Sequence, residues 1–193
     1  MNFDNNVLHI KNMVCPRCIS VVEDILHELN FSFEKVKLGE VILNNFFSNN
    51  QVYTLKEKLK SHGFELLEDK KGKIVEALKT HIIQLVKNPN FNHSTKLSSF
   101  LSKEIGYDYS YISSLFTANE RVTIEKYVIL QKIEYVKELL SYDELTLSEI
   151  ADKLNYSSLA ALSTQFKSIT GTTPSHFKLL TFHGRKSLDN LIP

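Results

Sequence analysis

The 193-residue sequence predicts two parts: an α+β part with the element order βαββαβ, followed by an all-α part. Before residue 70, short apolar segments of the kind found in strands alternate with two amphipathic helical stretches. After residue 73, the apolar residues follow helical spacing, and one segment of this second part occurs twice. The chain is therefore expected to join a small mixed sheet to a purely helical region.

The first part contains four predicted strands and two predicted helices. The first helix carries apolar residues at helical spacing from Ile19 to Leu29, and the second ends at Gly63, a residue type that commonly follows a helix. A turn at Gly39 joins the two middle strands. The strands are expected at residues 7–10, 31–38, 41–47 and 64–67. This order is the ferredoxin-like split βαβ arrangement, built in about 70 residues.

A polar segment, DKKGK at residues 69–73, separates the two patterned regions. Such a hydrated segment predicts a domain boundary. We therefore expect a first domain at residues 1–70, a hinge at 71–73, a helical domain at 74–182 and a tail at 183–193. A helix over residues 74–86 opens the second domain, and the cluster Asn88-Pro89-Asn90 ends this helix.

The helical part contains an internal repeat. LSKEIGY at residues 101–107 aligns with IADKLNY at 150–156, at an offset of 49. ISSLF at 112–116 aligns with LSTQF at 162–166, and TIEKY at 123–127 aligns with TPSHF at 173–177, both at an offset of 50. The sequence therefore contains one module twice, with a single-residue slip in its turn.

Each copy has the pattern of a helix-turn-helix unit. Its first helix ends at Gly106 or Asn155, two residue types that readily adopt the left-handed backbone of a sharp turn, and a tyrosine, Tyr107 or Tyr156, is expected to pack after the turn. Thr146 and Glu149 form a predicted capping box. A connecting helix over residues 124–140 has a length of about 26 Å. Two recognition helices on such a rod suit successive major grooves, about 34 Å apart.

The helical part resembles the DNA-binding domain of AraC/XylS-type transcriptional regulators. The resemblance is carried by LSEIADKLNYSSLAALSTQFKSITGTTPSHFK at residues 147–178, and it extends from residue 74 to about residue 180. It implies a double helix-turn-helix domain that binds double-stranded DNA. By this resemblance the base-facing candidates are Ser110, Ser113, Ser114, Leu159, Ala160, Ser163, Thr164 and Lys167. The phosphate-contacting candidates flank the modules: Lys103, Lys126, Ser175, His176 and Lys178. Because arginine is missing from both faces, weight shifts to backbone contacts and DNA shape.

Both cysteines of the chain, Cys15 and Cys18, lie in the segment NMVCPRC at residues 12–18. After a first strand, such a pair sits in the loop that opens a helix, where free N–H groups and the helix dipole favour thiolates. Soft sulfur ligands at this spacing suit Cu(I), which accepts two ligands, or Zn(II), which prefers four. A redox-active dithiol and a purely structural loop are the two alternatives.

The same segment resembles the metal-binding loop of heavy-metal-associated domains, the ferredoxin-like modules of copper chaperones and metal-pumping ATPases. The match covers residues 13–18 and is supported by Gly63-Phe64 before the last strand. It implies that Cys15 and Cys18 are metal ligands and that Met13 and Phe64 support the loop. His62, close by in the sequence, is a candidate third ligand. Asn12 departs from the family, which usually has glycine there.

The two resemblances together predict a one-component DNA-binding transcriptional regulator that responds to a thiophilic ion, with Cu(I) favoured over Zn(II). The alternatives are a thiol-redox regulator using the same cysteines, and a metal-trafficking or interaction protein whose helical part binds protein. Nothing in the sequence predicts an enzyme. With a net charge of +1, DNA binding must come from a local basic face. We expect a soluble, cytoplasmic protein whose partners are DNA and a metal ion, and a homodimer stays open.

Overall fold

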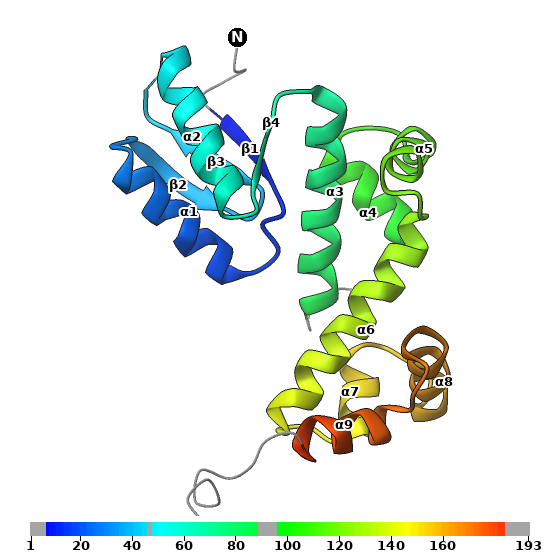
Figure 1. The fold of residues 1–193 in the computed structure, drawn as a ribbon. Helices are drawn as coiled ribbons and strands as arrows, with labels where there is room; N and C mark the ends of the chain where they lie inside the picture. The colour runs from blue at the N-terminus through cyan, green and yellow to red at the C-terminus, as the bar shows by residue number, and fades with distance from the viewer. Residues whose placement is uncertain (1–6, 46–47, 89–95, 184–193) are drawn as a thin grey trace, which may run out of the picture. The chain divides into compact units, whose positions relative to one another are not determined.

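The computed structural model describes residues 7–45, 48–88 and 96–183 (Figure 1). The chain divides into two compact units: residues 1–83 with 93–123, and residues 84–92 with 124–193. The first unit contains the sheet and the first copy of the helical module. The second unit contains the connecting helix and the second copy. No helix in the described residues is long and apolar enough to cross a lipid bilayer.

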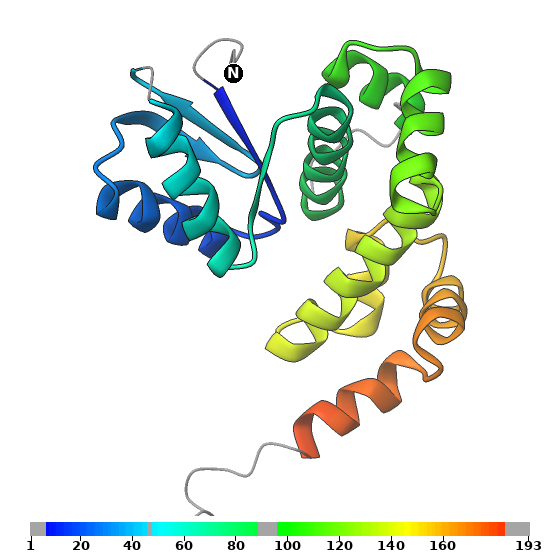
Figure 2. The same cartoon turned by 45° about the horizontal axis from the view of Figure 1, so that its top comes forward.

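The sheet of the first unit has four strands in the order β2-β3-β1-β4, and every neighbouring pair is antiparallel. The strands are β1 (Val7–Lys11), β2 (Phe33–Lys37), β3 (Glu40–Leu43) and β4 (Glu65–Leu67). Helices α1 (Pro16–Glu28) and α2 (Asn49–Ser61) connect them and lie side by side over one face of the sheet (Figures 1 and 2). The predicted element order βαββαβ is therefore confirmed.

The core of this sheet lies between the strands and the two helices. Leu8 and Ile10 are buried and alternate with half-buried residues along β1, so their side chains point to the same face. They meet apolar residues from α1 and α2, including Leu26 and Leu55, which are fully buried. Burying these side chains in place of exposing them contributes roughly 1.5–3 kcal/mol each.

Residues 71–73, where the sequence predicts a hinge, lie in the first turn of helix α3 (Lys70–Lys87). Asp69 starts this helix: its Oδ2 accepts a hydrogen bond of 2.6 Å from the N–H of Gly72, and its carbonyl oxygen accepts one of 3.2 Å from the N–H of Lys73. An aspartate in this position satisfies N–H groups that would otherwise lack a partner. The polar run is thus an exposed helix start. The domain limits 1–70 and 74–182 stay predictions, and residues 184–193 of the tail lie outside the described residues.

The helical repeat is present in the structure as two pairs of helices with matching ends. Gly106 has φ 76° and Asn155 has φ 54°, so both take the left-handed conformation predicted at the turns. The second helices of the two pairs each have 12 residues. The first pair is α4 (Leu97–Ile105) and α5 (Tyr109–Glu120), and the second is α7 (Leu147–Lys153) and α8 (Leu159–Thr170).

Two further helices complete the second unit: α6 (Ile124–Tyr142) and α9 (Pro174–His183). Helix α6 has 19 residues and is therefore about 28 Å long. The capping box of Thr146 and Glu149 is formed at the start of α7, as predicted, with each side chain bonded to the backbone N–H of the other residue. Helices α8 and α9 both contact α6, which therefore supports the second copy of the module.

Lys132 of α6 fixes the turn of the second module. Its Nζ donates a hydrogen bond of 2.8 Å to the carbonyl oxygen of Leu154 and lies 5.2 Å from the centroid of the Tyr156 ring. The Tyr156 hydroxyl donates to Gln165 on α8 at 2.6 Å. Burial lowers the pKa of Lys132 and raises the pKa of Tyr156 to about 12. These contacts tie α6, the end of α7 and α8 together.

We expect Lys132→Met to lower the free energy of unfolding by about 1–2 kcal/mol, because it keeps the apolar stem but removes a charged hydrogen bond. Urea denaturation measures this change. Lys137→Met is the matched control on the same helix, since Lys137 only pairs with Glu134 three residues earlier. Removing such a surface pair costs less than about 0.5 kcal/mol. Equal losses in the two variants would contradict the role given to Lys132.

Candidate thiol site and candidate nucleic-acid interface

The cysteine pair lies where the sequence predicts it, in the loop that opens α1. Cys15 is the N-cap residue with an extended backbone, and Pro16 occupies the first turn, where its fixed φ favours helix initiation. The N–H of Cys18 donates a hydrogen bond of 3.0 Å to the carbonyl oxygen of Cys15. The two sulfur atoms lie 3.4 Å apart, and both thiols are partly exposed. The pair is therefore positioned to act as one two-sulfur site.

Opposing effects set the pKa of the Cys15 thiol. Partial burial alone would raise it, but hydrogen bonds from the backbone and thiol of Cys18 lower it, as do the backbone N–H and the positive charge of Arg17. The lowering effects together exceed the burial effect, and the pKa of Cys15 lies below its ordinary value. Because the thiolate is both the nucleophile and the metal ligand, Cys15 is prepared for either chemistry.

Cys15 is expected to react with iodoacetamide at lower pH than N-acetylcysteine does, since its lowered pKa gives more thiolate at a given pH. Alkylation of the Cys15 peptide, followed by mass spectrometry across a pH series, measures this difference. In Cys18→Ala the pH profile should shift upwards, because one of the hydrogen bonds that lower the pKa is removed. A wild-type profile that coincides with that of N-acetylcysteine would contradict the expectation.

His62, the candidate third ligand, is not grouped with the cysteines in this structure. The described residues contain no group of three or more His, Cys, Asp or Glu side chains that could hold a metal ion. The role of His62 as a ligand stays a prediction. His62 is the C-cap residue of α2, and its Nδ1 lies 3.0 Å from the carbonyl oxygen of Lys58 and 3.1 Å from the hydroxyl of Ser61. The imidazole is thus directed to the end of its own helix.

The two residues predicted to support the loop are buried. Met13 and Phe64 both belong to the core cluster of the sheet, and Cys18 packs against the same cluster. Their burial agrees with a packing role. Whether they tune metal binding stays a prediction.

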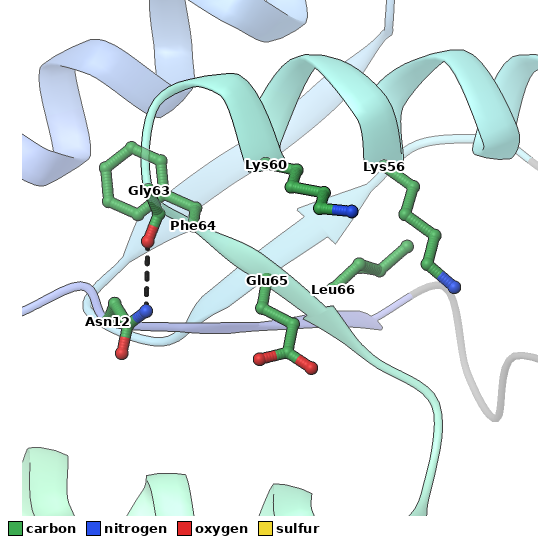
Figure 3. Close-up of a pocket in the computed structure, with 7 residues that line it drawn as sticks. All are labelled: Asn12, Lys56, Lys60, Gly63, Phe64, Glu65 and Leu66. Carbon is green, nitrogen blue, oxygen red and sulfur yellow. Dashed lines mark hydrogen bonds between the residues drawn. The ribbon is translucent and has the colours of Figure 1, made fainter.

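Asn12 shapes the loop that precedes the cysteines. Its φ of 73° is left-handed, a conformation that asparagine adopts more readily than other non-glycine residues. Its Nδ2 donates a hydrogen bond of 2.9 Å to the carbonyl oxygen of Gly63, as Figure 3 shows. Both residues line a pocket of about 430 Å³, and the full lining is Asn12, Lys56, Lys60, Gly63, Phe64, Glu65 and Leu66. The loop before the cysteines is therefore held against the turn between α2 and β4.

The predicted base-facing residues lie on the surface of α5 and α8. On both helices the opposite face is buried, with Phe116 and Phe166 fully inaccessible at positions 50 residues apart. The exposed members are Ser110, Ser114, Leu159, Ala160, Thr164 and Lys167, and the half-buried members are Ser113 and Ser163. Each helix thus presents small polar and apolar groups that are able to approach a base edge.

The predicted phosphate-contacting residues fall into two groups. Lys103, Lys126, Ser175 and His176 are exposed near helix ends. Lys178 is half-buried, and its ammonium group forms an ion pair with Asp143. It would have to give up this partner in order to contact a phosphate.

Two exposed tyrosines of the first module were missed as candidates. Tyr107 is 36% exposed, where packing was expected, and its ring centroid lies 5.4 Å from that of Tyr111 on α5. The Nζ of Lys70 lies 5.9 Å from the Tyr107 centroid. The position of Tyr111 beside Ser110, off the apolar stripe, was the sequence signal that could have identified it. These rings add polarizable surface and a hydroxyl donor next to the predicted base-facing residues of α5.

Two helix pairs with matched turns define the class of this region: it is a double helix-turn-helix domain. Residues 101–179 match the family described as a helix-turn-helix domain. The chain is 20% identical over 166 residues to an uncharacterized HTH-type transcriptional regulator, YtdP, of Bacillus subtilis. That match covers 84% of this chain but only 21% of the relative, so the chain spans about a fifth of the relative's length.

Two solved structures share the fold. The C-terminal domain of AraT, a response regulator from Geobacillus stearothermophilus, has a TM-score of 0.50 and 18% identity, covering 63% of this chain and 93% of that domain. A Chromobacterium violaceum transcriptional regulator described as having an AraC-type DNA-binding domain has a TM-score of 0.51 and 12% identity, covering 57% and 93%. The helical part of this chain therefore has the fold of AraC-type DNA-binding domains.

Proposed function

We propose that this chain is a DNA-binding transcriptional regulator. The observation that carries the proposal is the duplicated helix-turn-helix module, in which α5 and α8 have buried faces 50 residues apart in register and small polar residues outside. Packing alone does not require the same module twice. A duplex with regularly repeated major grooves is a partner that suits two such helices.

The proposed input is a thiophilic ion at Cys15 and Cys18, within a ferredoxin-like module of the heavy-metal-associated type. The two neighbouring thiols at one helix start supply two soft ligands, which favours Cu(I) because this ion accepts two such ligands. A closed zinc site would require two more ligands, and the described part of the chain brings no third His, Cys, Asp or Glu to the pair. The ion, when bound, supplies charge neutralisation and a fixed distance between the thiolates.

The contact between the two sulfurs also favours a second input, a reversible disulfide. Two thiols 3.4 Å apart, one with a lowered pKa, have the proximity that a dithiol switch needs. The proposed output of both inputs is a change in DNA affinity. The two inputs are distinguished by whether Cu(I) changes DNA affinity under fully reducing, anaerobic conditions.

The test of the output is DNA binding by the full chain. We expect binding to random-sequence duplex DNA whose affinity falls steeply with salt, and tighter binding to duplexes recovered by selection from a random library. No binding at low salt would contradict the proposal and favour a metal-trafficking or interaction protein. An anaerobic Cu(I) titration then tests the input, with Cys15→Ser/Cys18→Ser expected to lose both Cu(I) binding and any effect of Cu(I) on DNA affinity.

A further inference from the structure

Helix α3 carries the two buried polar side chains of the described residues, Glu76 and Thr80, which are 4% and 9% exposed. They are four residues apart and therefore lie on one face of the helix. Thr80 lies against the turn between β2 and β3, where a Cβ added to Gly39 would come within 3.1 Å of its hydroxyl. Glu76 faces the turn between β1 and α1: its Oε1 accepts a hydrogen bond of 3.1 Å from the N–H of Asn12. One face of α3 is thus docked on two turns of the sheet.

The carboxylate of Glu76 is the centre of a short polar chain. Its Oε2 lies 3.3 Å from the Nζ of Lys79, whose side chain is only 13% exposed. The same Nζ lies 3.7 Å from Oε1 of Glu120, the last residue of α5. A buried carboxylate is tolerated only when it is paired, so Glu76 depends on both Asn12 and Lys79. All four residues belong to the first compact unit.

This chain of contacts links the two proposed sites. Asn12 precedes Cys15 by three residues, and its own position is fixed by the hydrogen bond to Gly63. Glu120 ends the helix that we propose as the first reader of DNA. Any change in the loop that withdraws the Asn12 N–H leaves Glu76 with Lys79 as its remaining partner among these contacts. A tighter Glu76–Lys79 pair competes with the longer Lys79–Glu120 pair, because one ammonium group serves both carboxylates.

We propose that Glu76 and Lys79 are positioning residues that couple Cu(I) binding at the cysteine pair to the DNA affinity of the first helix-turn-helix module. This inference rests on the proposed function, since it needs both an input at the cysteines and an output at α5. The coupling runs in both directions: if Cu(I) changes DNA affinity by some factor, DNA changes Cu(I) affinity by the same factor. The contacts from Asn12 through Glu76 and Lys79 to Glu120, here called the relay, are the physical element through which each site would bias the other.

The test compares coupling factors in full-length variants under anaerobic conditions. DNA affinity is measured with and without Cu(I), and Cu(I) affinity with and without the selected duplex. For the wild type we expect a coupling factor of about 5-fold or more, the lower end of typical allosteric coupling. Glu76→Gln keeps the oxygen that accepts from Asn12 but loses the charge that holds Lys79. It should retain Cu(I) binding, and its coupling factor should fall below about 2-fold.

Glu68→Gln is the matched control, because Glu68 forms an exposed ion pair with Lys56 and lies outside the relay. Its coupling factor should equal that of the wild type. Glu120→Gln changes the partly exposed last residue of this series of contacts. It tests the same relay and keeps the inference falsifiable if Glu76→Gln fails to fold. Coupling in Glu76→Gln or Glu120→Gln that equals the wild-type value overturns this inference alone. A wild type that binds DNA with no Cu(I) effect overturns the proposed input together with it.

Discussion

Replacing Phe166 by alanine is expected to lower the free energy of unfolding of the second unit by about 3–5 kcal/mol. Phe166 is fully buried on the inner face of α8, and its ring packs edge-to-face with Phe177 of α9 at 5.6 Å. The substitution removes this ring contact and the free energy gained by transferring an aromatic ring from water into the core. It also leaves a cavity. Because whole domains are stable by only about 5–15 kcal/mol, the variant should be marginally folded. Its affinity for DNA should therefore be measurably lower than that of the wild type.

The repeat supplies an internal comparison for this expectation. Phe116, 50 residues earlier on α5, is also fully buried, so Phe116→Ala should have a loss of similar size in the first unit. Leu159→Ala is the control on α8, since Leu159 is 39% exposed, and it should change stability by less than about 0.5 kcal/mol. Urea denaturation gives all three values. A loss below about 1 kcal/mol for Phe166→Ala would show that α8 does not depend on this side chain.

The ends of the helices in the helical part were predictable because their chemistry is local. A left-handed turn residue at Gly106 or Asn155, and a reciprocal pair at Thr146 and Glu149, need only neighbours within a few residues. The repeat strengthened each assignment, because both copies obey the same pattern. The same locality placed Cys15 at the start of α1.

The sequence did not reveal that residues 71–73 are helical or which way the His62 ring points, and the reason is shared. The polarity of residues 71–73 indicates that they are solvated, but an exposed first helical turn is as solvated as a hinge. The hydrogen bond from the N–H of Gly72 to Asp69 is the feature that identifies a helix start. Proximity of His62 to Gly63 in the sequence says nothing of the direction of its ring, which the end of α2 decides. In both cases residue type and sequence position do not determine the three-dimensional geometry.

The contacts of Glu76 could not be predicted from the sequence at all. Its hydrogen bond to Asn12 joins residues 64 positions apart, and no periodicity reports such a pair. A carboxylate at residue 76, between the apolar Val75 and Leu78, resembles an ordinary exposed position of an amphipathic helix. Long-range polar contacts of this kind depend on how α3 docks, which is decided by tertiary packing. Residues that connect two sites are therefore the ones that sequence patterns identify least well.

Placing a carboxylate on the outer face of either recognition helix is expected to weaken DNA binding by about 100-fold, since like charges brought together at an interface cost several kcal/mol. Ser114 on α5 and Thr164 on α8 are exposed equivalents, 50 residues apart, so Ser114→Glu and Thr164→Glu should leave the fold intact. The measurement is the affinity for the selected duplex at fixed salt. Weakening by both variants means that both modules contact DNA, whereas weakening by one assigns contact to that module alone.

Two controls separate charge at the interface from other effects. Thr54→Glu introduces the same charge at an exposed position on α2, outside both helix-turn-helix pairs, and it should change DNA affinity by less than about 3-fold, because exposed charges farther apart than a Debye length of about 8 Å are largely screened. Thr164→Gln adds similar bulk without charge, so it should weaken binding less than Thr164→Glu does. If neither Ser114→Glu nor Thr164→Glu weakens binding more than Thr54→Glu, the outer faces of α5 and α8 do not contact the duplex.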